Sequence, residues 1–118
     1  MLSMLQNNII TGTGGRLRYG YNIMGEVGGK TGTTNNNADS WFMGVSPKVV
    51  AATWIGGEDR ATHLVNRGEG SVVALPVFGK FMNKLYKDKS LGIMPEDKFM
   101  EPIGVIKYEC DGGDRTCD

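Results

Sequence analysis

The residues with the most chemical potential form one short run, Lys30-Thr31-Gly32-Thr33-Thr34, and two more glycines precede it. Lysine offers a positive charge to a carboxylate, and threonine hydroxyls can donate hydrogen bonds to the same group. Glycine lets a ligand or another backbone come close to the strand. Exposed N–H groups on an edge strand can pair with a peptide or stabilise the oxygen of an acyl intermediate. The run therefore predicts a binding strand for an anionic, peptide-like ligand.

Two other interpretations of this run compete with a binding strand. A phosphate-binding loop follows the pattern G-x-x-x-x-G-K-[ST], with a helix that opens at the lysine. Its first glycine would fall at position 24, which is Met24, and Gly32 together with the asparagines at 35–37 breaks a helix at Lys30. The second alternative is a glycine-rich strand that serves only a tight turn, and the three residues Lys30-Thr31-Gly32 taken alone do not exclude it.

The elements around the run predict a small antiparallel sheet. A helical pattern opens the chain without a capping residue, as if cut from something longer, and the glycine-rich residues 11–15 end it. Residues 23–34 are expected to be extended, and β-branched and aromatic residues at 40–45 and 49–55 predict two further strands. Because both of these runs are apolar on both sides, we expect both faces of the central strands to be covered.

A second helix is predicted after the sheet. Ser71 can cap a helix that runs to about Tyr86, with Pro76 near its first turn and apolar residues at helical spacing: Leu75, Phe78, Met82 and Leu85. The fold class is therefore α+β, with a short antiparallel sheet of about three strands and the N- and C-terminal helices on one face. We expect Trp41 and Trp54 in the core, and His63, Glu26, Glu58 and Asp59 as ordinary polar residues.

Composition excludes several classes of function. The 118 residues suit one domain or a piece of one, and 13 basic residues balance 13 acidic ones, so charge does not favour nucleic acid as a partner. The basic residues are scattered along the sequence, and no apolar run approaches the ~20 residues that cross a bilayer. Cys110 and Cys117 cannot form a four-ligand zinc site, and they form either a small disulfide loop or two free thiols. We expect no metal and no cofactor.

The context of the run resembles the third motif region of penicillin-binding proteins. The doubled threonine and the Trp41-Phe42 pair look more like the bifunctional class A enzymes than the monofunctional class B enzymes. The resemblance covers about residues 1–85 and implies a fragment of the β-lactamase/transpeptidase-like fold. Residues 1–102 would be the C-terminal portion of the transpeptidase domain, and 103–118 a polar tail. The segments that carry the resemblance are 29–34, 39–47, 54–57, 68–70, 74–78 and 81–82.

The resemblance implies D,D-transpeptidation. In that family a serine attacks the D-Ala-D-Ala carbonyl of a peptidoglycan stem peptide, and β-lactams mimic this substrate. The family uses the motifs S-x-x-K, S-x-N and K-T-G. By position, Lys30 would be catalytic by supporting the relay and the substrate carboxylate, and the Thr33 N–H would supply half of the oxyanion hole. The hydroxyls of Thr31 and Thr33 would contact the carboxylate, Gly32 would leave room for the ligand, and Thr34 would complete the substrate-binding run.

The sequence departs from the family in one respect. None of its five serines is followed by lysine three residues on or by asparagine two residues on. We expect the nucleophile, its base and the relay before residue 1, together with a glycosyltransferase domain and a membrane anchor. The isolated chain should then be inactive.

The resemblance also implies partners and a location. The partners would be the stem peptide, β-lactams and the remainder of the chain's own domain, at the periplasmic face of the inner membrane. An uncovered sheet edge and apolar surface would favour self-association of the isolated chain. The alternative function is a non-catalytic module that pairs a partner along its exposed sheet edge by strand addition.

Overall fold

The computed structural model describes residues 1–59, 61–64, 68–101 and 103–104. Most of the expected tail, including Cys110 and Cys117, lies outside the described residues, as do Arg60, Arg67 and Pro102. The elements are, in chain order, α1 (Leu2–Thr11), α2 (Arg16–Tyr21), β1 (Gly28–Thr33), the 3-10 turn η1 (Asn35–Asn37), β2 (Asp39–Val45), β3 (Val50–Gly56), α3 (Ala74–Lys87) and the 3-10 turn η2 (Lys89–Leu91).

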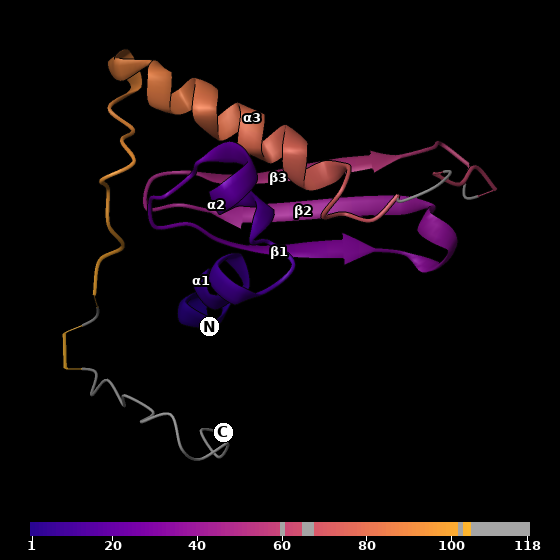
Figure 1. Ribbon diagram of the computed structural model, residues 1–118, viewed down its shortest axis with the longest axis horizontal. Helices are drawn as coiled ribbons and strands as arrows, with labels where there is room; N and C mark the ends of the chain where they lie inside the picture. Colours follow the sequence, from indigo (N-terminus) through magenta and orange to yellow (C-terminus); the bar gives the residue numbers. More distant parts are fainter. Residues whose placement is uncertain (60, 65–67, 102, 105–118) are drawn as a thin grey trace.

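The three strands form one antiparallel sheet in the order β1-β2-β3 (Figure 1). Lys30 lies opposite Met43, and Thr31 lies opposite Phe42. The three helices contribute side chains to a single core around Phe42, so they cover the same face of the sheet. The expected α+β class, with the N- and C-terminal helices on one face, is confirmed.

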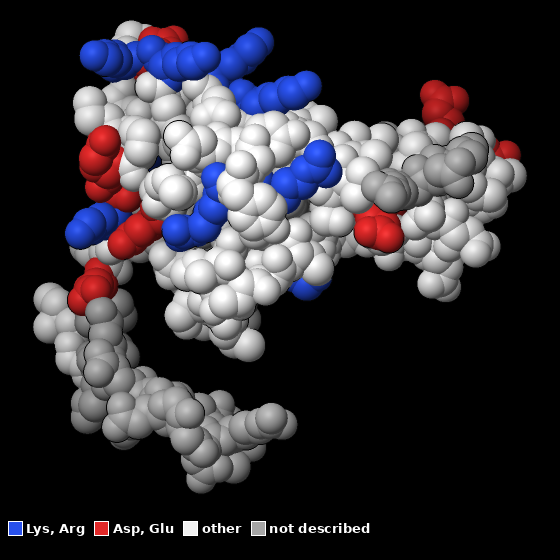
Figure 2. Space-filling model, in the orientation of Figure 1, with Lys and Arg blue, Asp and Glu red and all other residues white. Residues whose placement is uncertain are grey.

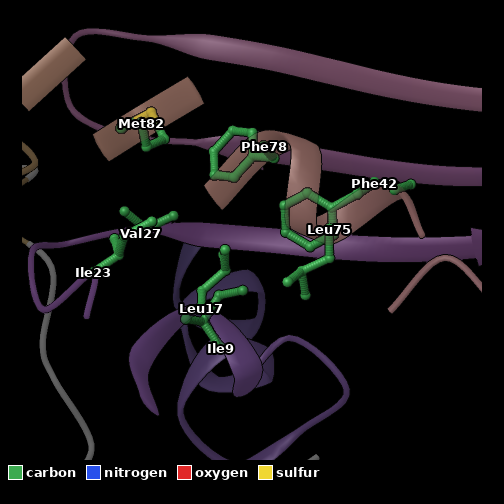
Figure 3. Close-up of a cluster of buried hydrophobic side chains, with 9 residues drawn as sticks. Ile9, Leu17, Ile23, Val27, Phe42, Leu75, Phe78 and Met82 are labelled. Atoms are coloured by element: carbon green, nitrogen blue, oxygen red, sulfur yellow. The ribbon is translucent and has the colours of Figure 1, made fainter. Parts of the chain in front are cut away.

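The core forms between α3, β2 and the two N-terminal helices (Figure 3). The rings of Phe42 and Phe78 lie 5.0 Å apart between centroids and are tilted by 53°, an arrangement that aromatic pairs favour. Gly44 lies next to Phe42 on the same face of β2, and a Cβ there would overlap the Phe78 ring. Glycine at this position therefore lets α3 pack closely on the sheet. The buried apolar cluster comprises Ile9, Leu17, Ile23, Val27, Phe42, Ala74, Leu75, Phe78 and Met82.

The other face of the sheet is open, contrary to expectation. Trp41 and Trp54 are 42% and 47% exposed, and Met43 is 54% exposed. The ring centroids of Trp41 and Trp54 are 6.4 Å apart. The Trp54 indole donates a hydrogen bond to Asp39, with 2.9 Å between Nε1 and Oδ1. The predictions of two covered faces and of tryptophans in the core are therefore wrong. The apolar runs of β2 and β3 gave no sign that their alternate residues face away from all three helices.

The N-terminal region contains a helix that the sequence did not predict. The glycines at 12, 14 and 15 end α1, but α2 begins immediately at Arg16 and buries Leu17. Asn22 adopts the left-handed conformation (φ 54°) where α2 ends, as asparagine commonly can. The extended stretch is shorter than expected, since β1 begins only at Gly28.

The helix α3 agrees with its apolar pattern but not with its predicted cap. It begins at Ala74 and no side chain caps it, so Ser71 lies before the helix, in a turn held by N–H bonds to the Glu69 carbonyl. Pro76 falls in the first turn, where its missing N–H has no helical partner to lose. The basic residues of α3 are less scattered than expected. Lys80, Lys84 and Lys87 are spaced by four and three residues, so they lie on one side of the helix. Figure 2 shows basic side chains along α3 and over α2 on the helical face.

Candidate functional site

The exposed edge of β1 presents backbone hydrogen-bonding groups. Just beyond the strand, the Thr34 N–H donates to the Asp39 carbonyl at 3.0 Å, so it points toward β2. Backbone groups alternate in direction along an antiparallel strand. The N–H and C=O groups of Thr31 and Thr33 therefore point away from β2, toward the edge. In agreement with this alternation, the Gly29 carbonyl also points outward and accepts a bond from Asn8 Nδ2 at 2.7 Å.

Lys30 places a positive charge on this edge. Its side chain is exposed and starts on the open face of the sheet, the face of Trp41 and Met43. Its ammonium donates to the outward carbonyl of Thr31, with 2.6 Å between Nζ and O. A ligand anion that pairs with the edge would therefore meet this ammonium.

The threonine hydroxyls of β1 lie on the opposite, helical face from the Lys30 side chain, since side chains alternate along a strand. Thr33 Oγ1 accepts the Gly70 N–H at 3.1 Å and so keeps its own proton for a ligand. Thr31 Oγ1 lies 3.0 Å from Thr13 Oγ1. Thr34 Oγ1 accepts the N–H of Asp39 at 2.8 Å, which closes the turn between β1 and β2.

The loop before α3 supports the strand, and sequence reasoning missed this role. Besides the Gly70–Thr33 contact, the Ser40 hydroxyl donates to the carbonyl of Gly68. A Cβ at Gly70 would come within 2.7 Å of the Gly32 carbonyl oxygen. The only sequence signal is the Gly68-Glu69-Gly70 spacing, which allows this close approach of two backbones.

Gly29 and Gly32, two of the three glycines of β1, differ in their surroundings. A Cβ at Gly29 would lie 2.7 Å from the Phe42 ring and 3.0 Å from the Met43 carbonyl oxygen. A Cβ at Gly32 would meet only the Cβ of Trp41, at 3.3 Å. The space over Gly32 is therefore open to a ligand, whereas the space at Gly29 is filled by the protein.

The other candidate residues do not join this site. Glu26 accepts the Phe99 N–H at 2.7 Å, and Glu58, Asp59 and His63 are exposed. Among the residues with described positions, no three His, Cys, Asp or Glu side chains group as metal ligands. In that same part of the chain, no helix has the length and apolar character to cross a membrane.

A concavity lies away from the β1 edge. It is a groove of about 430 Å³ between α1, α2 and the segment before β1, and no residue of 30–34 lines it. We favour the edge over this groove because the edge combines a cation with outward N–H groups. The groove is lined by Ser3, Gln6, Asn7, Ile10, Arg18, Met24, Gly25, Glu26 and Val27.

No family model matches the chain, but individual relatives do. The penicillin-binding protein 1A of Rickettsia conorii is 43% identical over 88 residues, which are 74% of this chain and 10% of the relative. That of Pseudomonas aeruginosa is 37% identical over 111 residues, 94% of this chain and 12% of the relative. The chain thus spans about a tenth of the length of these relatives.

A solved structure gives the same result. The crystal structure of penicillin-binding protein 1A from Haemophilus influenzae superposes with a TM-score of 0.66 at 29% identity, over 84% of this chain and 15% of that one. Sequence and fold therefore agree with the resemblance carried by the 30–34 run and its flanking strands. The chain belongs to the class A penicillin-binding proteins, of which it matches one segment.

Proposed function

We propose that this chain is the part of a D,D-transpeptidase domain that holds the substrate peptide, or a β-lactam, along the K-T-G strand β1. The observation that carries the proposal is the edge of β1, where the outward groups of Thr31 and Thr33 lie beside the Lys30 ammonium. A stem peptide would add to this edge as an extended strand. Lys30 would attract its terminal carboxylate, and the Thr33 hydroxyl would donate to the same group.

The Thr33 N–H supplies half of the oxyanion hole in this proposal. It points outward from β1, so it can donate to the oxygen of the tetrahedral intermediate. One such donor lowers the barrier by about 3–4 kcal/mol. Lys30 adds electrostatic support for the proton relay, which is why we assign both residues to catalysis, with Gly32 and Thr34 in the substrate-binding run.

The nucleophile comes from another part of the domain in this proposal. The hydroxyl of Ser40 is buried and donates to the Gly68 carbonyl. Ser46 donates to the Val49 carbonyl, and Ser90 donates to Asp88 at 2.6 Å. Among the described residues, no lysine or histidine is the hydrogen-bond partner of these three hydroxyls, and none of them has a base to activate it. The chain supplies the binding strand, and acyl transfer requires the S-x-x-K and S-x-N motifs of the complete domain.

The open face of the sheet is the surface that the remainder of the domain covers. Trp41, Met43 and Trp54 present apolar side chains there, and contiguous exposed apolar patches mark interaction sites. In isolation, the chain would cover this face by associating with itself. The domain as a whole would work outside the cytoplasm, at the periplasmic face of the inner membrane, where its peptidoglycan substrate lies, and a glycosyltransferase domain would share the chain.

A fluorescent penicillin tests the proposal. The complete domain that carries this segment should be covalently labelled, and the isolated chain should not. Lys30→Ala should slow labelling about 10-fold to 150-fold, because a hydrogen bond to a charged group contributes about 1.5–3 kcal/mol. Lys80→Ala, which removes an exposed lysine from α3, is the matched control and should label at the normal rate.

Three results would contradict the proposal. Labelling of a serine in the isolated chain would show that this segment holds its own nucleophile. Equal labelling rates for the Lys30 and Lys80 variants would remove Lys30 from the site. A complete domain that binds stem peptide along β1 but is never acylated would favour the alternative, a non-catalytic strand-addition module.

A further inference from the structure

We propose that Thr13, anchored by Asn8, is a positioning residue that sets the direction in which the Thr31 hydroxyl donates its proton. The inference rests on the proposed function, because it concerns the same K-T-G strand. Thr13 lies in the short link between α1 and α2, and its hydroxyl oxygen is 3.0 Å from that of Thr31. Residues 12–15 of this link contain no charged side chain, so hydrogen-bond polarity alone sets the direction of the Thr31 proton.

The orientation of the Asn8 amide fixes one end of the chain of hydrogen bonds. A backbone carbonyl only accepts, so the group 2.7 Å from the Gly29 oxygen is the Asn8 NH2. The Asn8 Oδ1 is then the atom that lies 3.4 Å from the Thr13 hydroxyl. Because an amide oxygen only accepts, Thr13 donates to Asn8.

This polarity determines what Thr31 can offer. Thr13 has a single hydroxyl proton. When Thr13 donates that proton in a hydrogen bond to Asn8, it can only accept a hydrogen bond from Thr31. Without a ligand, therefore, the Thr31 proton points at Thr13 and its lone pairs face outward. A ligand carboxylate needs a donor instead.

Carboxylate binding would reverse the direction of the hydrogen bonds that Thr31 and Thr13 donate. Thr31 rotates its proton to the ligand, and Thr13 rotates its own proton from Asn8 to the Thr31 oxygen. The bond that is given up is the 3.4 Å contact with Asn8, the longest of the three, and the bond gained is charge-assisted. Neither hydroxyl is left without a partner in either state.

The surroundings hold Asn8 and Thr13 in place for this exchange. A Cβ at Gly12 would come within 2.9 Å of the Asn8 carbonyl oxygen, so the link packs tightly against the end of α1. A Cβ at Gly28 would lie 3.0 Å from Leu5 Cβ, which shows that α1 also lies directly against β1. The helix and the strand are therefore packed directly against each other, and this packing sets the distance between the two hydroxyls.

The first test uses the chain itself and is independent of catalysis. Thr13→Val and Thr31→Val keep the side-chain shape and remove each hydroxyl. Unfolding in urea should show a coupling between them, with the effect of the double variant on the folding constant smaller than the product of the single effects by about threefold to tenfold. Thr11→Val is the matched control: within the described part of the chain, the Thr11 hydroxyl bonds only to Asn7 of the same helix, and it should show no coupling with Thr31. Additive effects for Thr13 and Thr31 would overturn the inference.

The second test measures acylation by penicillin in the complete domain with this segment in place. Thr13→Val should slow acylation about threefold to tenfold, Thr13→Ser should restore it, and Thr13→Val should have no further effect once Thr31 is valine. Normal acylation by Thr13→Val alongside slow acylation by Thr31→Val would overturn the inference and leave the proposed function intact. Normal acylation by both valine variants and by Lys30→Ala would instead refute the proposed function, and with it the role that we assign to Thr13. Coupling in the first test would then remain as a structural contact only.

Discussion

Gly29 and Gly32 occupy the same strand, yet alanine at each should have opposite consequences. At Gly29 a methyl group would lie 2.7 Å from the Phe42 ring and 3.0 Å from the Met43 carbonyl oxygen. Phe42 is fully buried against Phe78, and the carbonyl belongs to the neighbouring strand, so neither can yield. Gly29 is therefore a packing requirement of the fold.

The magnitude follows from two opposing terms. Overpacking of a filled core costs about 1–3 kcal/mol. Replacing glycine by alanine also restricts the unfolded chain, which stabilises the folded state by about 0.4–1 kcal/mol. Gly29→Ala should therefore lower the free energy of unfolding by about 1–2 kcal/mol. Gly32→Ala meets only Trp41 Cβ at 3.3 Å, so the two terms nearly cancel and the change should stay within about 0.5 kcal/mol.

Ligand binding should rank the two variants in the reverse order. In the proposed function, a methyl group at Gly32 would occupy the space through which the ligand approaches β1, and a similar overpacking of about 1–3 kcal/mol should slow penicillin acylation of the complete domain about fivefold to 150-fold. Urea unfolding of the chain gives the first quantity, and fluorescent penicillin labelling gives the second. Equal loss of stability in both variants, or normal labelling by Gly32→Ala, would refute the distinction between a structural and a functional glycine.

Three further predictions concern the core, the surface and pH. Phe78→Ala should lower the free energy of unfolding by about 3–5 kcal/mol in urea, because the ring is buried, whereas Val77→Ala, its exposed neighbour, should change it by less than about 0.5 kcal/mol. If the isolated chain associates with itself as proposed, Trp41→Ser should reduce this association in light scattering, since it removes apolar area from the open face; unchanged association would assign it to another surface. The hydrogen bond from Lys48 holds the pKa of Asp97 below its ordinary value of 3.8. The stabilisation from this contact is therefore fully present above pH 3.8 and is lost as the pH falls through the folded-state pKa of Asp97. A fall in the protection of the amides around residue 97, relative to their intrinsic exchange rate, on acidification that is absent in Asp97→Asn would confirm it, and identical acid responses would contradict it.

The sequence predicted those parts of the fold that depend on local pattern. The spacing of Leu75, Phe78 and Met82 predicted the buried face of α3, since residues three and four apart share one side of a helix. The β-branched and aromatic runs predicted β2 and β3 with errors of one residue at their ends. In contrast, α2 was missed, because glycines 12, 14 and 15 indicate where a helix ends but not whether another begins after them.

Residue type and order alone were enough to identify the candidate strand and its family. A lysine, a glycine and three threonines in five consecutive positions already determine which groups can bind an anion, because that chemistry belongs to the side chains themselves. Only the tertiary structure decided how they are presented: β1 is an edge strand, Lys30 starts on the face opposite the hydroxyls of Thr31 and Thr33, and Thr33 is held by Gly70, which is 37 residues away in sequence. The open face of Trp41 and the contact between Thr13 and Thr31 were equally beyond prediction. Both depend on which segments of the chain pack together, and this packing cannot be predicted from a local sequence pattern.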